Sequence, residues 1–157
     1  MKRVVCENVR SAYNVWNIIR TADALWRWVI LLWYTAPIDH KEIQKTALGA
    51  EKIIPTKRFD KWSKIDIIEE WKNSIVICAE KTFNSIPLQN LKPKVNKITN
   101  NQVDDIYLIV GNEVIWVEEE TINQSDIVRH MDMLGIKESL NVWQASAIFM
   151  REINRIL

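Results

Sequence analysis

Hydrophobic residues recur at steps of three or four positions through the first part of the chain, a spacing typical of α-helices. Between residues 7 and 34, the positions that follow this spacing are Tyr13, Trp16, Ile19, Trp26, Val29, Ile30 and Trp33. Thr21 and Asp23 both favour helix caps, so the segment can divide into two helices, and Pro37 ends it. The pattern therefore predicts a helical N-terminal region.

A further helix is expected between Asp39 and Gly49. Asp39 can act as the N-cap, Glu42 follows three positions later as in a capping box, and Gly49 can end the helix. A short helix, a turn and a basic segment in this order resemble a helix-turn-helix. Pro55 is badly placed for the recognition helix of that motif, so a plain helical packing unit fits the sequence better.

Cations alternate with aromatic residues in the next segment, "KRFDKWSK". Lys57, Arg58, Lys61 and Lys64 surround Phe59 and Trp62. This arrangement suits contact with nucleic-acid phosphates and stacking on bases. The start of an amphipathic helix, with Trp62 directed inward and the lysines in water, fits the segment better. Hydrophobic periodicity continues and predicts a long helix over residues 60–83, although the β-branched residues 74–78 are also compatible with a strand.

Residues 105–110 and 113–119 are the clearest strand candidates, and the Gly-Asn pair between them indicates a tight hairpin. The polar, Asn-rich residues 84–102 predict a connection with at most one short strand. A helix is expected over residues 125–135, followed by a buried strand over residues 141–150.

These elements together predict an α/β (or α+β) fold in two parts. Residues 1–59 form a helical unit that is a candidate for binding nucleic acid. Residues 60–157 form an α/β core in which a hairpin and a helical crossover build a mixed sheet flanked by helices.

The composition is that of a globular protein, with 48% hydrophobic and 26% charged residues. Cys6 and Cys78 lack metal-ligand spacing, which indicates free thiols in a reducing, cytoplasmic compartment. The longest hydrophobic run, residues 24–36, is too short to span a bilayer and contains Arg27, so no membrane association is expected.

The net charge of +1 conceals a division along the chain. Residues 1–100 contain 17 Lys and Arg against 10 Asp and Glu, whereas residues 101–157 contain 4 against 10. This asymmetry fits a basic surface for a polyanion beside an acidic cluster for cations. The asymmetry can equally have arisen by chance, with every charged side chain exposed to solvent.

Four carboxylates stand at the ends of the expected hairpin strands. Glu118 and Glu120 project to the same face of a strand, and Glu119 projects to the other. Antiparallel pairing would bring Asp105 close to them, so that three carboxylates meet at one edge of the sheet. Magnesium, or manganese, prefers such oxygen ligands and can activate a water molecule for phosphodiester hydrolysis. Alternatively, the three glutamates are the end of a strand that runs out into solvent.

Asp105, twelve intervening residues and the triplet Glu118-Glu119-Glu120 after an apolar strand resemble the PD-(D/E)XK nuclease superfamily. This resemblance implies a restriction-endonuclease-like fold over residues 60–157. It implies metal binding by Asp105, by Glu118 and by the backbone carbonyl of Glu119.

The resemblance departs from the family pattern at Glu120, because the third position of the motif is usually lysine. A few restriction enzymes of the superfamily carry glutamate there. In some members the basic residue lies in the next helix, where Arg129 or His130 could fill this role.

The hypothesis from the sequence is a metal-dependent nuclease that hydrolyses DNA. Asp105, Glu118 and Glu120 would be catalytic, Mg²⁺ or Mn²⁺ would be the cofactor, and the cations of residues 57–64 would contact the DNA backbone. One alternative is a non-catalytic nucleic-acid-binding protein on the same fold. Another is an α/β protein whose charge asymmetry mediates binding to a partner or self-association as a homodimer.

Overall fold

The computed structural model describes residues 1–26, 28–38, 53–63, 74–91, 95–96, 103–112 and 114–156. Seven strands form one sheet in the order β3-β2-β1-β6-β4-β7-β5, and all neighbouring strands are parallel. The strands are β1 (Lys2–Cys6), β2 (Val29–Leu32), β3 (Thr56–Phe59), β4 (Ser74–Ala79), β5 (Ile86–Pro87), β6 (Asp105–Val110) and β7 (Ile127–His130). The helices whose bounds lie within the described residues are α1 (Ala12–Leu25), α6 (Glu119–Asn123) and α7 (Val142–Ile156), with the 3-10 helix η1 (Leu88–Asn90). Because the strands are parallel, their carboxyl ends all lie along one edge of the sheet.

The central strands are continuous hydrophobic runs because both faces of the sheet are covered. β6 lies between β1 and β4, and all six of its residues are buried. Alternate residues of β1 enter different clusters: Val4 and Cys6 join one hydrophobic core, whereas Val5 joins a second core on the other face. Parallel strands that are covered on both faces are typically rich in branched hydrophobic residues of this kind.

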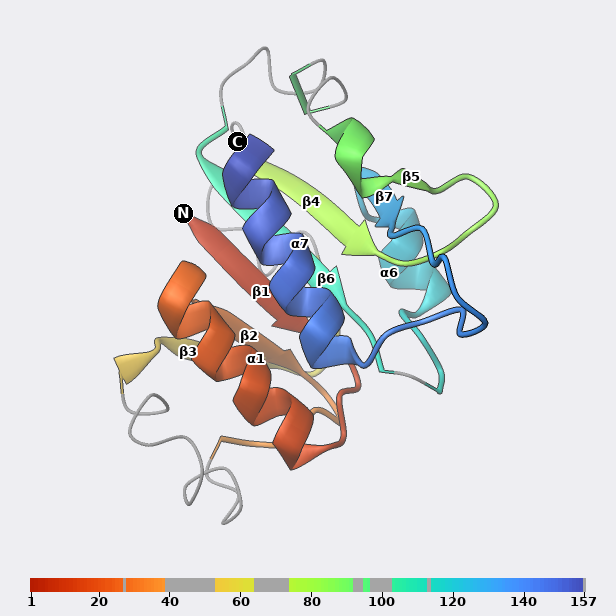
Figure 1. The fold of residues 1–157 in the computed structure, drawn as a ribbon. Coiled ribbons are helices and arrows are strands. Elements are labelled where there is room, and N and C mark those ends of the chain that lie inside the picture. The colour runs from red at the N-terminus through yellow and green to blue at the C-terminus, as the bar shows by residue number, and fades with distance from the viewer. Residues whose placement is uncertain are drawn as a thin grey trace.

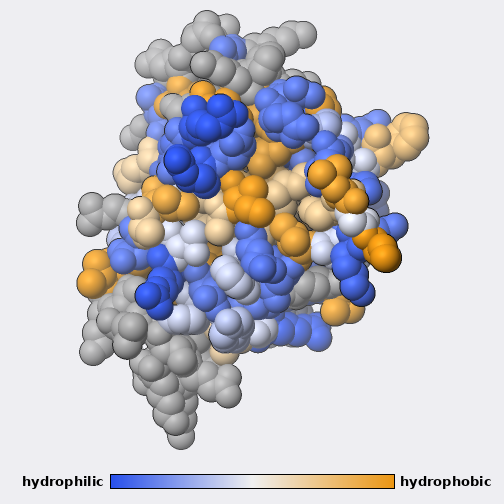
Figure 2. Space-filling model, viewed as in Figure 1, coloured by the Kyte–Doolittle hydropathy of each residue, from blue (hydrophilic) through white to orange (hydrophobic). Residues whose placement is uncertain are grey.

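Helices α1 and α7 pack against each other on one face of the sheet (Figure 1). Each begins at a polar cap: Ser11 Oγ accepts a hydrogen bond of 3.3 Å from the Asn14 amide, and Asn141 Oδ1 accepts one of 3.2 Å from the Trp143 amide. Figure 2, viewed from the same side, shows hydrophobic surface gathered in a band across the middle of this face, between hydrophilic areas. On the opposite face, the second core includes Trp62 and Val117, and Ile122 of α6 packs against it.

The hairpin predicted over residues 105–119 is wrong. β6 forms as expected, but the chain after it makes turns with one isolated bridge between Asn112 and Trp116, and α6 begins at Glu119. The Asn112 side chain explains the difference, because its Oδ1 accepts the amides of Val114 and Ile115 at 2.7 and 2.8 Å. A side-chain acceptor that binds two successive amides winds the backbone into a turn instead of an extended strand.

Two further assignments in the second half are reversed. The helix expected over residues 125–135 contains strand β7, and the strand expected over residues 141–150 is the start of α7. A short hydrophobic run does not show whether its residues repeat with the period of a helix or of a strand. Either a helix or a strand can therefore form from such a run when it is buried between two layers.

The N-terminal region is also less helical than predicted. A strand, β1, precedes α1, and the hydrophobic residues after α1 form β2. Residues 74–79 form the strand β4, so the long helix predicted over residues 60–83 is wrong in that part. The helix predicted between Asp39 and Gly49, and most of the proposed helix-turn-helix, fall outside the described residues.

The α/β class is confirmed, but the mixed sheet is wrong because every pairing among the described strands is parallel. The division at residues 59 and 60 stays a prediction, and strands from both ranges lie in the same sheet. No helix in the described part of the chain has the length and hydrophobicity needed to cross a membrane.

Candidate functional site at the carboxyl ends of the strands

A pocket opens where β4, β6 and β7 end. Residues from four segments line it, among them Glu80, Gly111, Met131, Leu140 and Phe149. Loops at the carboxyl ends of parallel strands are the usual place for a ligand in open α/β sheets.

The loop after β6 forms one wall of the pocket, and Gly111 allows it to fold back on itself. A Cβ atom at this position would lie 2.5 Å from the backbone carbon of Trp116, so only glycine fits. Asn112 fixes the same loop, since its Nδ2 donates a 3.0 Å hydrogen bond to the Asn8 carbonyl at the end of β1. The loop therefore has a fixed shape that depends on backbone contacts.

A buried carboxylate ties the end of β1 to the start of α6. The Glu7 carboxylate accepts hydrogen bonds from the Thr121 hydroxyl at 2.6 Å and from the Glu118 amide at 2.8 Å. Asn8 Nδ2 donates to Glu118 Oε1 at 3.0 Å. Burial raises the pKa of the Glu7 carboxyl; the hydrogen bonds from Thr121 and Glu118 oppose this shift, and the charge of Glu118 adds to it.

The structure separates the predicted catalytic carboxylates. Asp105 lies at the amino end of β6, and Glu118 lies beyond its carboxyl end, so the length of a strand stands between them. Glu119 and Glu120 are in the first turn of α6, where exposed Glu120 comes within 3.8 Å of Lys61 Nζ. Among the described residues, no three His, Cys, Asp or Glu side chains are grouped so that they could hold a metal ion.

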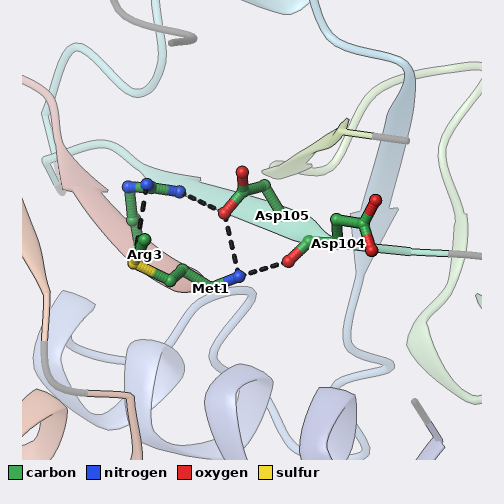
Figure 3. Close-up of polar contacts among 4 residues, drawn as sticks. All are labelled: Met1, Arg3, Asp104 and Asp105. Atoms are coloured by element: carbon green, nitrogen blue, oxygen red, sulfur yellow. Dashed lines mark hydrogen bonds and ion pairs between the residues drawn. The ribbon is translucent and has the colours of Figure 1, made fainter. Parts of the chain in front are cut away.

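Asp105 binds two positive groups (Figure 3). Its Oδ1 lies 2.6 Å from Arg3 Nη1 and 2.8 Å from the α-amino group of Met1, which also donates to the Asp104 carbonyl. Burial raises the pKa of Asp105, but the hydrogen bonds and charges of these two groups outweigh burial and hold that pKa below its ordinary value. Arg3 also lies against the Tyr107 ring, 4.9 Å from its centroid.

The two proposed basic helpers differ in their surroundings. The Arg129 side chain is buried; its Nη2 donates to the Asn90 carbonyl at 3.3 Å, and its Nε and Nη1 have no partner among the described residues. His130 Nδ1 lies 2.8 Å from Ser85 Oγ, and its Nε2 lies 3.5 Å from Asp132 Oδ1. Both residues line the pocket, on β7 and not on a helix.

The basic residues of the "KRFDKWSK" segment are spread along β3 and the turn that follows it. Lys57 Nζ lies 6.0 Å from the Trp28 ring centroid, and Arg58 Nη2 donates to the Thr35 carbonyl at 3.0 Å. Trp62 is buried in the second core, as expected, but residues 56–63 form a strand and irregular backbone, not the start of a helix. Lys64 lies outside the described residues.

Sequence reasoning missed the pocket because it assigned Gly111 and Asn112 to a hairpin turn. The informative signal was a wholly hydrophobic run, residues 106–110, followed directly by glycine. In a parallel sheet such a strand is buried on both faces, and the glycine after it permits a close backbone approach at the ligand edge.

Comparison with known proteins identifies the family. The model of the SpoU rRNA Methylase family matches residues 1–151. The chain is 28% identical over 152 residues to the tRNA (guanosine(18)-2'-O)-methyltransferase of Aquifex aeolicus, covering 97% of this chain and 68% of that protein. It is 27% identical over 150 residues to the 23S rRNA (guanosine(2553)-2'-O)-methyltransferase RlmP of Bacillus subtilis, covering 95% and 56%.

Solved structures share the fold. The SpoU methyltransferase AviRb of Streptomyces viridochromogenes, in complex with the cofactor AdoMet, superposes with a TM-score of 0.80 at 19% identity, covering 99% of this chain and 59% of that one. An AdoMet-bound rRNA methyltransferase of Sinorhizobium meliloti gives 0.82 at 23% identity, covering 99% and 56%. The fold is thus that of the SpoU methyltransferases, an open parallel sheet with its pocket at the carboxyl edge. The chain belongs to the SpoU rRNA Methylase family.

This membership corrects the hypothesis drawn from the sequence. The assignment to the PD-(D/E)XK superfamily and the restriction-endonuclease-like fold are wrong. DNA as the partner and a DNA nuclease or nuclease-like binding protein as the function are wrong as well, since the relatives are RNA methyltransferases. Magnesium or manganese as the cofactor is also wrong, because related structures contain AdoMet.

Replacing Asp105 with Asn tests whether this carboxylate is structural. Arg3, whose side chain is 6% exposed, would lose its anionic partner, so the free energy of unfolding should fall by about 3 kcal/mol. The loss of stability should be complete at pH values above 3.8, the pKa of the Asp105 carboxyl in the unfolded state. It should shrink as the pH falls through the lower pKa that this carboxyl has in the folded state. Urea denaturation at several pH values measures it. An Arg3→Met and Asp105→Asn double variant should recover part of the loss, and a single variant as stable as the parent would contradict the role.

A second prediction concerns Glu7 and pH. A raised carboxyl pKa means that the folded state binds the proton more tightly, so this group's contribution to stability falls as pH rises from the unfolded value near 4.5 through the folded pKa. Glu7→Gln should remove this dependence. As the pH rises from 5 to 8, the free energy of unfolding of the variant should therefore increase relative to that of the wild type. Glu7→Ala should instead lose about 1–3 kcal/mol at both pH values, because two donors lose their acceptor. Identical pH dependence in wild type and Glu7→Gln would refute the prediction.

A third prediction follows from the burial of Arg129. A buried guanidinium opposes folding when two of its nitrogens lack a partner, as those of Arg129 do among the described residues, and a hydrophobic residue of similar length removes that cost. Arg129→Met should therefore leave the midpoint of urea unfolding unchanged or raise it. Arg129→Ala should lower the midpoint, since it leaves a cavity. A clear loss of stability in Arg129→Met would show that the guanidinium has a stabilising partner.

Proposed function

We propose that this protein transfers a methyl group from AdoMet to a ribose 2'-hydroxyl of RNA. The observation that carries the proposal is the pocket at the carboxyl ends of β4, β6 and β7, in a chain that belongs to the SpoU rRNA Methylase family. The named relatives methylate guanosine 2'-hydroxyls in tRNA and in 23S rRNA, which supports the same reaction here. The chain spans 56–68% of the length of these two relatives, so the choice of RNA rests on experiment.

The residues of the pocket fit AdoMet. Hydrophobic side chains of Met131, Leu140 and Phe149 suit the adenine ring, and the folded loop at Gly111 presents backbone groups at close range. The carboxylates of Glu80 and Glu138 line the same pocket and favour the positive charges of the sulfonium and ammonium groups. Bound AdoMet would supply an electrophilic methyl group: the methyl carbon would bond to the ribose oxygen as its bond to sulfur breaks, S-adenosylhomocysteine would leave, and the hydroxyl proton would pass to solvent.

The pocket walls also act on the reaction. The contacts of Asn112 hold the loop in place, so little conformational entropy would be lost on binding. Hydrophobic walls exclude water from the reacting methyl group.

The direct test is methyl transfer from tritiated AdoMet. Transcripts of tRNA and of 23S rRNA fragments are incubated separately with the protein, and tritium in RNA is counted. Because 2'-O-methylation blocks alkaline hydrolysis of the next phosphodiester, labelled dinucleotides should survive alkali. Absence of transfer to both classes of RNA, or label that alkali releases in mononucleotides, would count against the proposal.

Gly111 gives a binding test that does not depend on the RNA. Gly111→Ala must displace the backbone at Trp116, so affinity for S-adenosylhomocysteine, measured by calorimetry, should fall about tenfold or more. Gly135→Ala is the matched control, because an added Cβ there meets nothing within 4 Å. Equal affinities in the two variants would place the cofactor elsewhere.

A further inference from the structure

Two adjacent aromatic side chains are exposed at the carboxyl end of β2. Trp33 is 50% exposed and Tyr34 is 59% exposed, and their ring centroids lie 5.0 Å apart with an interplanar angle of 53°. The guanidinium of Arg10, from the loop after β1, lies 5.7 Å from the Tyr34 centroid. Arg10, Trp33 and Tyr34 are called the aromatic platform below.

The base of the platform is rigid. Thr35, between the aromatic pair and Ala36, is buried, and its hydroxyl donates to the Cys6 carbonyl at 2.8 Å and accepts from the Val9 amide at 3.2 Å. The Ala36 amide donates to the Val9 carbonyl at 3.0 Å. These bonds join the loops after β1 and β2, so the platform is held by fixed backbone.

The backbone at Tyr34 is strained although its side chain is exposed. Its φ is 68°, in the left-handed region that bulky residues rarely adopt. Burial commonly offsets such strain, but the exposed Tyr34 ring gains little from it. Residues with a strained backbone that the surrounding structure holds rigidly are found most often at ligand sites.

Two cations, Arg58 and Lys61, lie on the segment beside the platform, and Lys61 Nζ is 3.8 Å from Glu120 Oε1. Arg58 reaches it from β3 by donating to the Thr35 carbonyl, and Lys61 follows Asp60, whose carbonyl accepts the Trp33 amide at 3.3 Å. Both cations are exposed. Exposed cations beside aromatic faces are the combination that binds single-stranded nucleic acid, through phosphates and stacked bases.

The platform and the pocket lie at the same edge of the sheet, with β1 between β2 and β6. Asn8, two residues before Arg10, accepts a hydrogen bond from Asn112 at the pocket wall. A polynucleotide with its target ribose at the pocket could therefore place a neighbouring nucleotide on the platform.

We infer that Trp33, Tyr34 and Arg10 stack an unpaired nucleobase of the RNA substrate, adjacent to the nucleotide that is methylated. This inference rests on the proposed function. An unpaired base offers a flat π-face to Trp33 and Tyr34, and the guanidinium of Arg10 can lie over the same base. Arg58 and Lys61 bind the phosphates on either side of the stacked base.

The test compares two fluorescein-labelled 12-nucleotide single-stranded RNAs by fluorescence anisotropy, one with all bases and one with four central abasic riboses. Trp33→Ala and Tyr34→Gly should each weaken binding of the complete RNA about tenfold. Binding of the abasic RNA should not change. Tyr34→Gly is informative because glycine accepts the left-handed backbone, so the variant should remain as stable as wild type. Wild-type affinity in both variants, or an equal loss for the abasic RNA, would overturn the inference.

Matched controls separate stacking from other effects. Phe83→Ala removes another fully exposed aromatic ring, in the loop after β4, and should leave both affinities unchanged; a comparable loss there would overturn the inference. Affinity for S-adenosylhomocysteine should be the same in all three variants. Base-dependent RNA binding that needs Trp33, in a protein that transfers no methyl group, would reject the proposed function while keeping the platform. Methyl transfer that is unaffected by Trp33→Ala at subsaturating RNA would reject the platform alone.

Discussion

Parallel pairing of β6 with β1 on one side and β4 on the other is the constraint on which the molecule depends. Five residue pairs join β1 to β6 and six join β4 to β6, so these three strands are held in one register. Because all three run in the same direction, their following loops leave the sheet at the same edge. The loop of Asn8, the loop of Gly111 and the end of β4 at Glu80 are therefore neighbours, although they are far apart in sequence. The pocket and the aromatic platform both follow from this arrangement.

Charged residues serve this architecture in two ways. At the amino edge of the sheet, Asp105 binds Arg3 and the α-amino group of Met1, so the negative charge of its carboxylate is neutralised there (Figure 3). At the carboxyl edge, the buried Glu7 carboxylate accepts hydrogen bonds from the Glu118 amide and the Thr121 hydroxyl, and these bonds fix the segment that leads into α6. Carboxylates that resemble a metal site in sequence are thus distributed between opposite edges of the sheet.

The fold places the basic and acidic parts of the chain at different positions along the carboxyl edge of the sheet. The excess of Lys and Arg in residues 1–100 includes Arg10, Arg58 and Lys61, which flank the exposed aromatic pair. The acidic residues 101–157 supply Glu118, Glu119 and Glu120, which are exposed around the start of α6. A polyanion is therefore favoured at the ends of β1, β2 and β3 and disfavoured near α6.

The sequence by itself determined the α/β class, the strand at residues 105–110, the burial of Trp62 and the division of charge. Each of these depends on local composition or on which residues avoid water. The hairpin, the long second helix and the final strand could not be determined this way, because hydrophobic runs as short as residues 127–130 and 141–150 carry no reliable period. Only the tertiary structure decided that Asp105 and Glu118 lie at opposite ends of a strand. The physical reason is that strand direction is set by pairing between distant segments, and a reversal of direction moves a residue from one edge of the sheet to the other.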